Sequence, residues 1–172
     1  MNRGPAKVKG GPSHAPVLAL ASRQLDVYSI GMTRAAVEQW LADHQAGFLA
    51  RSPDALAATH APDGTFESPA HGTVRSRAAI RDIYAYWYSA FPDFMLSWGA
   101  PLIDGPRAAV FWAFEGTTTG PFFGEVRAGT VVKMTGAAEF LFSEEGIVSV
   151  RHIFDFSKAL VTAGVLKIKP TT

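Results

Sequence analysis

Cysteine is absent from the 172 residues of this chain. Its absence excludes disulfide bonds, thiolate zinc sites and thiol nucleophiles, and it leaves the redox compartment undetermined. The five histidines show no ligand spacing such as HxxxH. Metal sites usually appear in a sequence as clustered ligands, so we expect no intrinsic metal site.

Long apolar and long basic runs are absent as well. No apolar stretch approaches the ~20 residues that a membrane-spanning helix requires. The 16 basic and 15 acidic residues give a net charge of +1 without a basic run, which argues against a nucleic-acid partner. A signal-like Ala19-Leu-Ala21 site follows an apolar part shorter than the usual ~7–15 residues, so we expect a cytoplasmic protein.

Apolar residues make up 48% of the chain and aromatic residues 12%, which is enough for one sizeable core. Residues 1–31 are rich in glycine and proline, a composition that favours disorder. We therefore expect a disordered N-terminal extension over 1–31, one domain over 32–167 and a short tail over 168–172.

Hydrophobic spacing predicts helices first and strands afterwards. Thr33 can cap a helix whose apolar stripe ends at Phe48, and Pro53 fits the first turn of a short helix that reaches His60. Another amphipathic helix is predicted over 76–90, and a last one begins near Ser157. Pro62-Asp63-Gly64 predicts a turn. Strands are predicted over 65–67, 94–103, 108–118, 130–142 and 147–156, so the pattern indicates an α+β fold.

The last two strands allow a prediction of register. A three-residue loop over 144–146, with Gly146 in a left-handed conformation, places Glu139 opposite Arg151 as an opposite-charge pair. His152 then belongs to the apolar face, and Asp155 nominally belongs to the polar one. Because a slip of one residue reverses every side chain, this register is favoured.

Several motifs together resemble a known family. They are Ala90-Phe-Pro-Asp93, Glu115-Gly116-Thr-Thr-Thr-Gly120, Phe123-Gly124, Glu145-Gly146-Ile147, and Asp155 followed nine residues later by Gly164. Over about residues 33–166 the chain resembles the SnoaL-like polyketide cyclases of the nuclear-transport-factor-2-like superfamily, which also holds ketosteroid isomerases and limonene epoxide hydrolase. The resemblance implies a cone-shaped, curved antiparallel sheet wrapped by three to four helices, an apolar pocket, and commonly a homodimer.

The resemblance also implies a catalytic residue. In these cyclases an aspartate at the end of the last strand acts as general acid/base, and Asp155 matches that position. Burial in an apolar pocket would raise its pKa towards neutrality. The alternative is that Asp155 caps the last helix. Arg151 and Thr162 depart from the family pattern, which favours a non-catalytic domain of the same fold.

Other side chains are candidates for the pocket. His152, among apolar neighbours, can act as a base or donor beside Asp155, or it can be a satisfied core residue. His44 has the same ambiguity. Arg151 and Glu139 form a structural pair or line the cavity, where Arg151 would bind a carboxylate. The aromatic candidates for the pocket wall are Tyr84, Trp87, Trp98, Trp112 and Phe114.

The leading expectation is acid/base chemistry without a cofactor on an apolar carbonyl compound, of polyketide cyclase or ketosteroid isomerase type. The alternative is a domain of the same fold that binds a small apolar or aromatic ligand, or a second copy, without catalysis. Epoxide hydrolysis is a further alternative, which would have to use Asp155, Arg151 and Glu139. The discriminating observation is whether Asp155 and His152 face one enclosed cavity.

Overall fold

The computed structural model describes residues 32–167, so the extension predicted over 1–31 and the tail over 168–172 lie outside the described residues. The helices are α2 (Arg34–Leu49), α3 (Pro53–Ala58), α4 (Arg77–Ala90) and α5 (Phe156–Ala163). The strands are β1 (His60–Ser68), β2 (Gly72–Arg75), β3 (Met95–Trp98), β4 (Leu102–Asp104), β5 (Arg107–Thr117), β6 (Val131–Ser143) and β7 (Gly146–Phe154).

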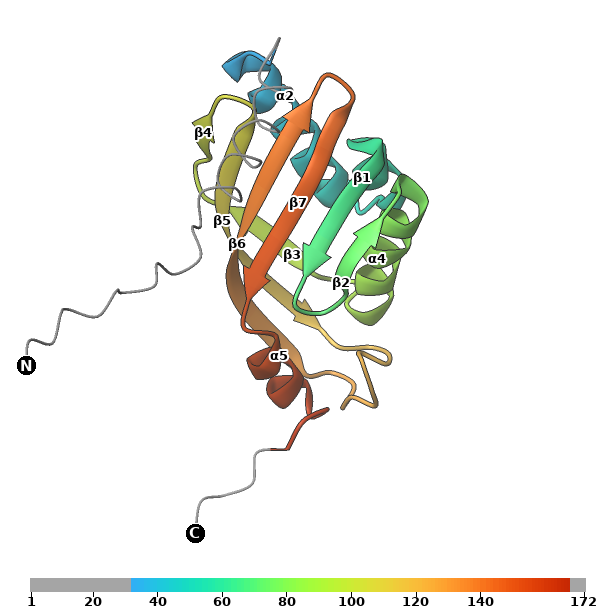
Figure 1. Ribbon diagram of the computed structural model, residues 1–172. Coiled ribbons are helices and arrows are strands. Elements are labelled where there is room, and N and C mark those ends of the chain that lie inside the picture. Colours follow the sequence, from blue (N-terminus) through green and yellow to red (C-terminus); the bar gives the residue numbers. More distant parts are fainter. Residues whose placement is uncertain (1–31, 168–172) are drawn as a thin grey trace, which may run out of the picture.

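All seven strands belong to one curved sheet with the order β2-β1-β7-β6-β5-β3, and β4 pairs with β5 (Figure 1). The expected α+β class and curved sheet are confirmed. One pairing departs from the expected antiparallel arrangement, because β1 pairs with β7 in parallel. A short turn in the sequence predicts that the two strands it connects will pair. Strands β1 and β7 are far apart in the sequence and no turn connects them, so their pairing was not predicted.

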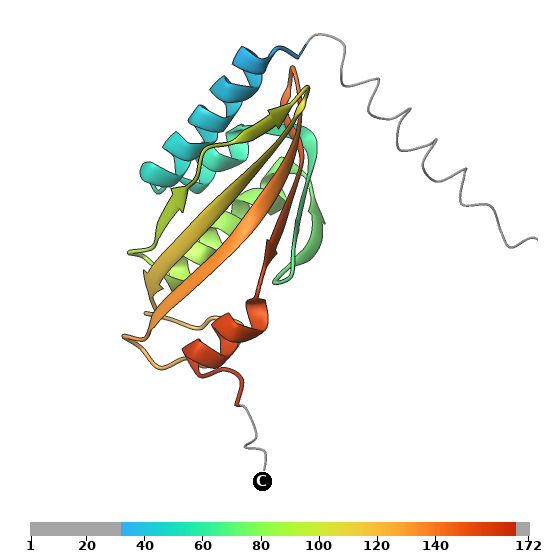
Figure 2. The same ribbon diagram turned by 90° about the vertical axis from the view of Figure 1, so that its left-hand side faces the viewer.

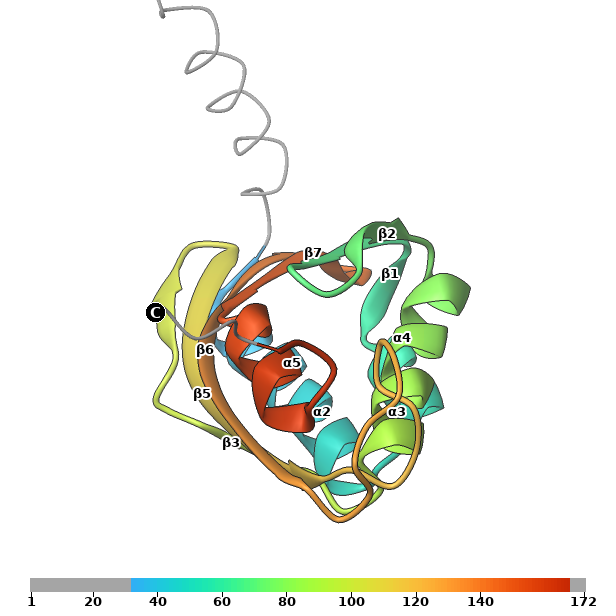
Figure 3. The ribbon, with the colours of Figure 1, turned by 90° about the horizontal axis from the view of Figure 1, so that it is seen from below.

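The sheet curls around its concave face, and the helices close the open side. In Figure 2 helices α2 and α4 lie on one side of the strongly twisted strands. Seen from below, the strands form an incomplete ring, and α5 lies across its lower end (Figure 3). The core fills the space between the concave face and the helices, and Phe91, Phe140 and Phe142 are fully buried there.

Hydroxyl side chains start the first three helices. The side chains of Thr33, Ser52 and Ser76 accept hydrogen bonds from the backbone N–H three residues later. Such bonds satisfy N–H groups that have no partner inside the helix. The apolar stripe expected on α2 is confirmed, since Val37 and Leu41 are buried.

The register of the last hairpin is confirmed in its centre and wrong at its turn. Glu139 pairs with Arg151, and the register shifts between Leu141 and Phe142. As a result Phe142 pairs with Ile147, and only two residues connect the strands. A bulge therefore absorbs the extra residue on β7, so the side chains beyond it keep the predicted faces.

Two sequence predictions about the other strands need correction. The turn expected over 62–64 is an irregularity within β1, where the pairing with β7 shifts between His60 and Thr65. The strand expected over 94–103 is divided into β3 and β4, because Pro101 lies in the stretch between them and cannot donate a ladder hydrogen bond. The short strand β2 was not predicted.

Gly146 provides a test of how closely the hairpin packs on α3. Its φ is 115°, and an added Cβ would lie 2.4 Å from the carbonyl oxygen of Thr59. We expect Gly146→Ala to lower the free energy of unfolding by about 3 kcal/mol, because strain and a backbone clash add. Gly105→Ala, with φ of 54° and open space around it, should cost only about 1 kcal/mol. Urea unfolding measures both, and equal losses would contradict the packing argument.

Candidate functional site

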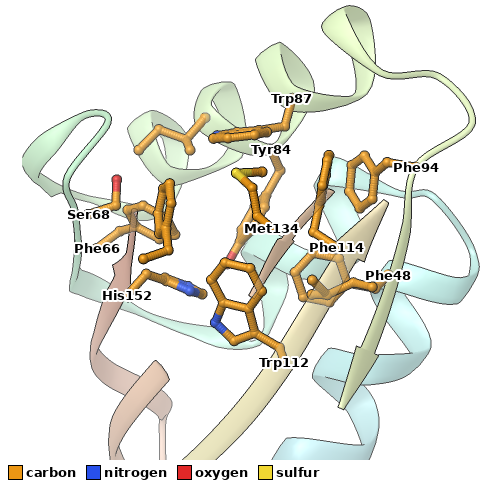
Figure 4. Close-up of a pocket in the computed structure, with 13 residues that line it drawn as sticks. Phe48, Phe66, Ser68, Tyr84, Trp87, Phe94, Trp112, Phe114, Met134 and His152 are labelled. Carbon is orange, nitrogen blue, oxygen red and sulfur yellow. The ribbon is translucent and has the colours of Figure 1, made fainter. Parts of the chain in front are cut away.

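An aromatic cavity of about 70 Å³ lies between the concave face of the sheet and α4 (Figure 4). Strands β5, β6 and β7 supply one wall, and α4 supplies the opposite one. Its lining consists of Phe48, Phe66, Ser68, Ile83, Tyr84, Trp87, Phe94, Leu96, Trp112, Phe114, Met134, His152 and Phe154. No charged side chain is among these residues, so the cavity suits a neutral, apolar ligand.

Five of the candidates named from the sequence line this cavity: Tyr84, Trp87, Trp112, Phe114 and His152. The other five, Trp98, His44, Arg151, Glu139 and Asp155, do not line it. Trp98 packs against the rings of His44 and Phe140 instead, with centroid distances of 5.9 Å. The alternation of β7 thus predicted the inward side chain of His152 correctly, whereas Trp98 on the short strand β3 packs outside the cavity.

Asp155 does not reach the cavity. It is the N-cap of α5, and its Oδ1 accepts a hydrogen bond of 2.9 Å from the backbone N–H of Lys158. The residue is exposed. The chain leaves β7 at this point and turns into α5, so the carboxylate satisfies the first turn of the helix. The helix-cap alternative describes the observed geometry, and the structure gives no support to the acid/base role that the resemblance implies.

Arg151 and Glu139 lie on the outer face of the sheet, where both are exposed. They are cross-strand neighbours as predicted, but each has a different ionic partner. The Nε of Arg151 is 3.2 Å from Oε1 of Glu67, and Glu139 pairs with Arg107. Strands β1 and β5 flank the hairpin and bring these partners closer, so a ligand-binding role for Arg151 in the cavity has no geometric basis.

His152 projects from β7 into the aromatic interior. Its ring lies 5.0 Å from that of Phe66 and 6.1 Å from that of Trp112. Burial lowers its pKa to about 4, so the imidazole is neutral at pH 7. Its Nε2 exposes no surface and has no hydrogen-bond partner. A buried nitrogen without a partner is costly, and such groups concentrate at functional sites.

A second nitrogen without a partner lies beside it. The Nε1 of Trp112 is also buried and unbonded. Figure 4 shows the two rings projecting towards one another from the same wall. The indole fits there because residue 136, on the neighbouring strand β6, is glycine. A Cβ at Gly136 would lie 2.4 Å from Cζ2 of the Trp112 ring.

A buried hydrogen-bond chain supports Tyr84 from behind. Thr59 donates its proton to the carbonyl of Leu56, so Nδ1 of His44 must donate to Thr59 Oγ1, at 2.7 Å. The Nε2 of His44 is then an acceptor. The Tyr84 hydroxyl lies 3.4 Å from this atom and 3.1 Å from Nε2 of His60. Burial lowers the pKa of both histidines and raises that of Tyr84, so the chain is neutral.

Some residues of this region are not predicted by the sequence pattern. His60 is predicted only as the end of a helix, and no pattern indicates the parallel pairing that carries Phe66 to the cavity wall. For Met134 a signal did exist. It lies on the inward face of β6, together with Val132, Ala138 and Phe140, at the period of two that a half-buried strand shows. That alternation predicts an inward side chain.

Within residues 32–167, no group of three or more histidine, aspartate or glutamate side chains is placed to hold a metal ion. No helix in this range is long and apolar enough to cross a bilayer. The expected cytoplasmic localisation stays a prediction, as does the absence of a nucleic-acid partner.

Comparison with known families agrees with this architecture. The model of the SnoaL-like polyketide cyclase family matches residues 37–161. The match covers most of the domain, and the chain therefore belongs to the SnoaL-like polyketide cyclase family. No curated protein matches the sequence.

Solved structures show the same fold at low sequence identity. The candidate hydroxylase AclR of Streptomyces galilaeus superposes with a TM-score of 0.68 and 22% identity, over 80% of this chain and 87% of its own. The candidate polyketide cyclase IdmH of Streptomyces antibioticus gives 0.64 and 21%, over 74% and 98%. A protein of Catenulispora acidiphila with a ketosteroid isomerase-like fold, crystallised with trimethylamine, gives 0.62 and 21%, over 73% and 92%.

The three buried histidines predict a pH dependence of stability. Folding lowers their pKa values, to about 3 for His60 and about 4 for His152, and well below the ordinary value for His44. The unfolded chain therefore binds more protons below its ordinary histidine pKa of ~6.5, and stability falls as the pH drops through that value. Each histidine should contribute up to about 1.4 kcal/mol per pH unit.

Urea unfolding between pH 8 and pH 5 tests this expectation in a window above the range in which most carboxylates titrate. Stability should be constant from pH 8 to about 7 and should decline towards pH 5. His152→Gln should reduce the slope by about a quarter to a third of its wild-type value, because half-buried His71 also has a pKa lowered by burial and adds a smaller contribution. A flat profile down to pH 5 would contradict the burial of neutral histidines.

Proposed function

We propose that this protein is a cofactor-free acid/base enzyme of polyketide cyclase or ketosteroid isomerase type that acts on an apolar carbonyl compound. The observation that carries the proposal is the neutral imidazole of His152, a residue of the cavity wall whose Nε2 has no partner and becomes accessible to a ligand when the side chains around it shift. Membership of the SnoaL-like polyketide cyclase family supports a reaction of this class.

The chemistry requires a base that is unprotonated at neutral pH and shielded from water. Nε2 of His152 takes a proton from the carbon next to the ligand carbonyl. The C–H bond breaks, an N–H bond forms, and the electron pair of the C–H bond moves onto the carbonyl oxygen as an enolate. Return of the proton to another carbon gives isomerisation. Attack of the enolate carbon on a second carbonyl, followed by transfer of the proton from Nε2 to the new alkoxide, gives aldol ring closure.

The aromatic wall contributes by excluding water. In a dry site the enolate is not quenched by bulk solvent, and polar groups interact more strongly than they do in water. A lowered pKa makes His152 a weaker base, but it also keeps the imidazole unprotonated over the whole neutral range. Proton transfer of this kind needs no cofactor.

A non-catalytic binding domain is the second candidate, and the position of Asp155 favours it. The acid that the resemblance makes catalytic caps α5 on the outside, and the cavity is only about 70 Å³ in volume. The third reading, epoxide hydrolysis, finds no support, because Asp155, Glu139 and Arg151 all lie outside the cavity.

Hydrogen–deuterium exchange distinguishes catalysis from binding. In deuterated buffer the protein should accelerate exchange of the α-protons of cyclohexanone, followed by proton NMR. His152→Gln removes the base and should lower the rate about 100-fold, as loss of a general base typically does. Asp155→Asn keeps a side chain that can cap the helix and should change the rate less than twofold. The rate should be flat from pH 8 to 6 and fall towards pH 4, where His152 becomes protonated.

Three outcomes would overturn the assignment. If His152→Gln exchanges protons as fast as the wild type, His152 is not the base. If Asp155→Asn alone abolishes exchange, the acid at the exit of β7 is catalytic despite its place on α5. Cyclohexanone that binds without any exchange favours the non-catalytic domain.

For the expected homodimer we propose the outer face of the sheet as the contact surface. Phe111 and Ile153 are 66% and 61% exposed, and they flank Ala137 in one row across β5, β6 and β7. Ion pairs lie on both sides of this row, Arg107 with Glu139 and Lys133 with Glu115. An apolar row with both signs of charge around it can pair with its own copy about a twofold axis.

Light scattering after size exclusion tests this surface. The wild-type protein should be a dimer at micromolar concentration, and Phe111→Glu should be a monomer, because the new charge would be buried in the interface. Leu49→Glu is the matched control, since Leu49 is 78% exposed at the end of α2 and away from the sheet. A wild-type monomer, or a dimer that survives Phe111→Glu, would rule this surface out.

A further inference from the structure

We propose that Trp112 is the residue that recognises the ligand oxygen, and that its indole N–H makes the cavity selective for small neutral carbonyl compounds over hydrocarbons of the same shape. The inference rests on the aromatic cavity as the ligand site of the proposed function. It adds a specificity-determining residue and a ligand class to that site, and it does not require turnover.

Trp112 has a fixed position in the cavity wall. It lies on the inward face of β5, is 7% exposed and lines the cavity. Its ring packs 5.6 Å from that of Phe154 and 6.1 Å from that of His152. On its other side the ring lies against the backbone of Gly136, where any side chain would collide with it. The indole is therefore held in one orientation.

The indole N–H of Trp112 is a hydrogen-bond donor without an acceptor. An indole nitrogen can only donate, and a buried tryptophan usually finds an acceptor for it. Leaving such a donor without an acceptor is unfavourable. Trp112 Nε1 has no acceptor among the described residues and exposes no surface, so a ligand oxygen reaches it when the side chains of the wall shift. A ligand that brings an acceptor oxygen recovers this cost on binding, whereas a hydrocarbon does not.

The electrostatics of the cavity favour a ligand oxygen that carries no charge. No cationic side chain lines the cavity, and burial keeps His152 neutral, so a carboxylate or phosphate would enter without a counter-charge. A carbonyl oxygen is neutral and accepts from Trp112. Nε2 of His152, on the same wall, also has no hydrogen-bond partner, so this nitrogen and Trp112 Nε1 can contact the same end of one ligand.

The volume of the cavity limits the size of the ligand. A volume of about 70 Å³ leaves room for a single ring or a short chain before side chains have to move. Met134 is the most adaptable part of the wall, because it is unbranched and has three rotatable bonds. The ligand class is therefore a small neutral ketone or aldehyde with an apolar body.

Cyclohexanone and methylenecyclohexane form a matched pair for the experiment, because they share a shape and differ by an oxygen in place of a CH₂ group. Ligand-observed NMR titration of the wild-type protein should give tighter binding of the ketone. Trp112→Phe keeps an aromatic ring and removes the N–H. It should weaken binding of cyclohexanone about tenfold, the value of one buried hydrogen bond, and leave methylenecyclohexane within twofold.

Trp98→Phe is the control, because Trp98 lies outside the cavity and should leave both affinities unchanged. Labelling of the tryptophan indoles with ¹⁵N gives a second readout that needs no substitution at residue 112. In the wild-type protein the Nε1–H resonance of Trp112 should move on addition of the ketone and stay near its free position on addition of the hydrocarbon. This readout remains decisive if Trp112→Phe does not fold.

Three results would overturn the proposal. Equal weakening of both ligands by Trp112→Phe would show that the ring acts only through its shape. A change in the titration of His152 without any difference between the ligands would show that Trp112 donates to His152 instead. Absence of ketone binding to the wild type would reject the ligand class. Failure of the proposed catalysis is distinct, since His152→Gln would then leave proton exchange unchanged while Trp112 still discriminates.

Discussion

The pairing of β6 with β7 is the constraint on which the interior of this protein depends. Neighbouring side chains on a strand point to opposite faces, so the register that sets Glu139 against Arg151 also decides which residues enter the cone. It directs His152 inward and Arg151 outward. A slip of one residue would exchange them, placing a guanidinium among phenylalanines and leaving the sheet without its neutral imidazole.

Desolvation then determines what the interior can do. Three histidines and one tyrosine lie in an environment with almost no compensating charge, and burial keeps all of them uncharged near pH 7. His44 and His60 each lie within hydrogen-bond distance of the Tyr84 hydroxyl, although Nδ1 of His60 is buried without a partner, whereas His152 is held only by packing. Its place on the cavity wall, together with this lack of hydrogen bonds, distinguishes His152 from the two histidines behind Tyr84.

Much of this arrangement could be predicted from the sequence. The cap at Thr33, the stripe on α4 and the alternation on β7 are local patterns, and local patterns depend on neighbours within a few residues. The inward side chain of His152 followed from the alternation on β7. The parallel contact of β1 with β7 could not be predicted, because no local pattern records which distant strands meet.

The failed expectations about the site have a similar cause. Asp155 stands where a strand ends, and the sequence cannot tell whether the chain there continues past the cavity or turns away into a helix. Likewise the hairpin placed Arg151 beside Glu139, but the flanking strands supplied nearer partners in Glu67 and Arg107. The Trp112 ring packs closely against Gly136 on the neighbouring strand. This contact depends on atomic packing across two strands, and the composition of the chain does not reveal it.

Asp155 also affects how long the last helix stays folded. Helix α5 has only eight residues, and it lies across the lower end of the cone (Figure 3). A helix so short is marginal by itself, so its N-cap and its contacts with the sheet set how often it frays. Asp155 thereby contributes to the lifetime of a terminal helix that covers one end of the curved sheet, which is a role in local folding rather than in proton transfer.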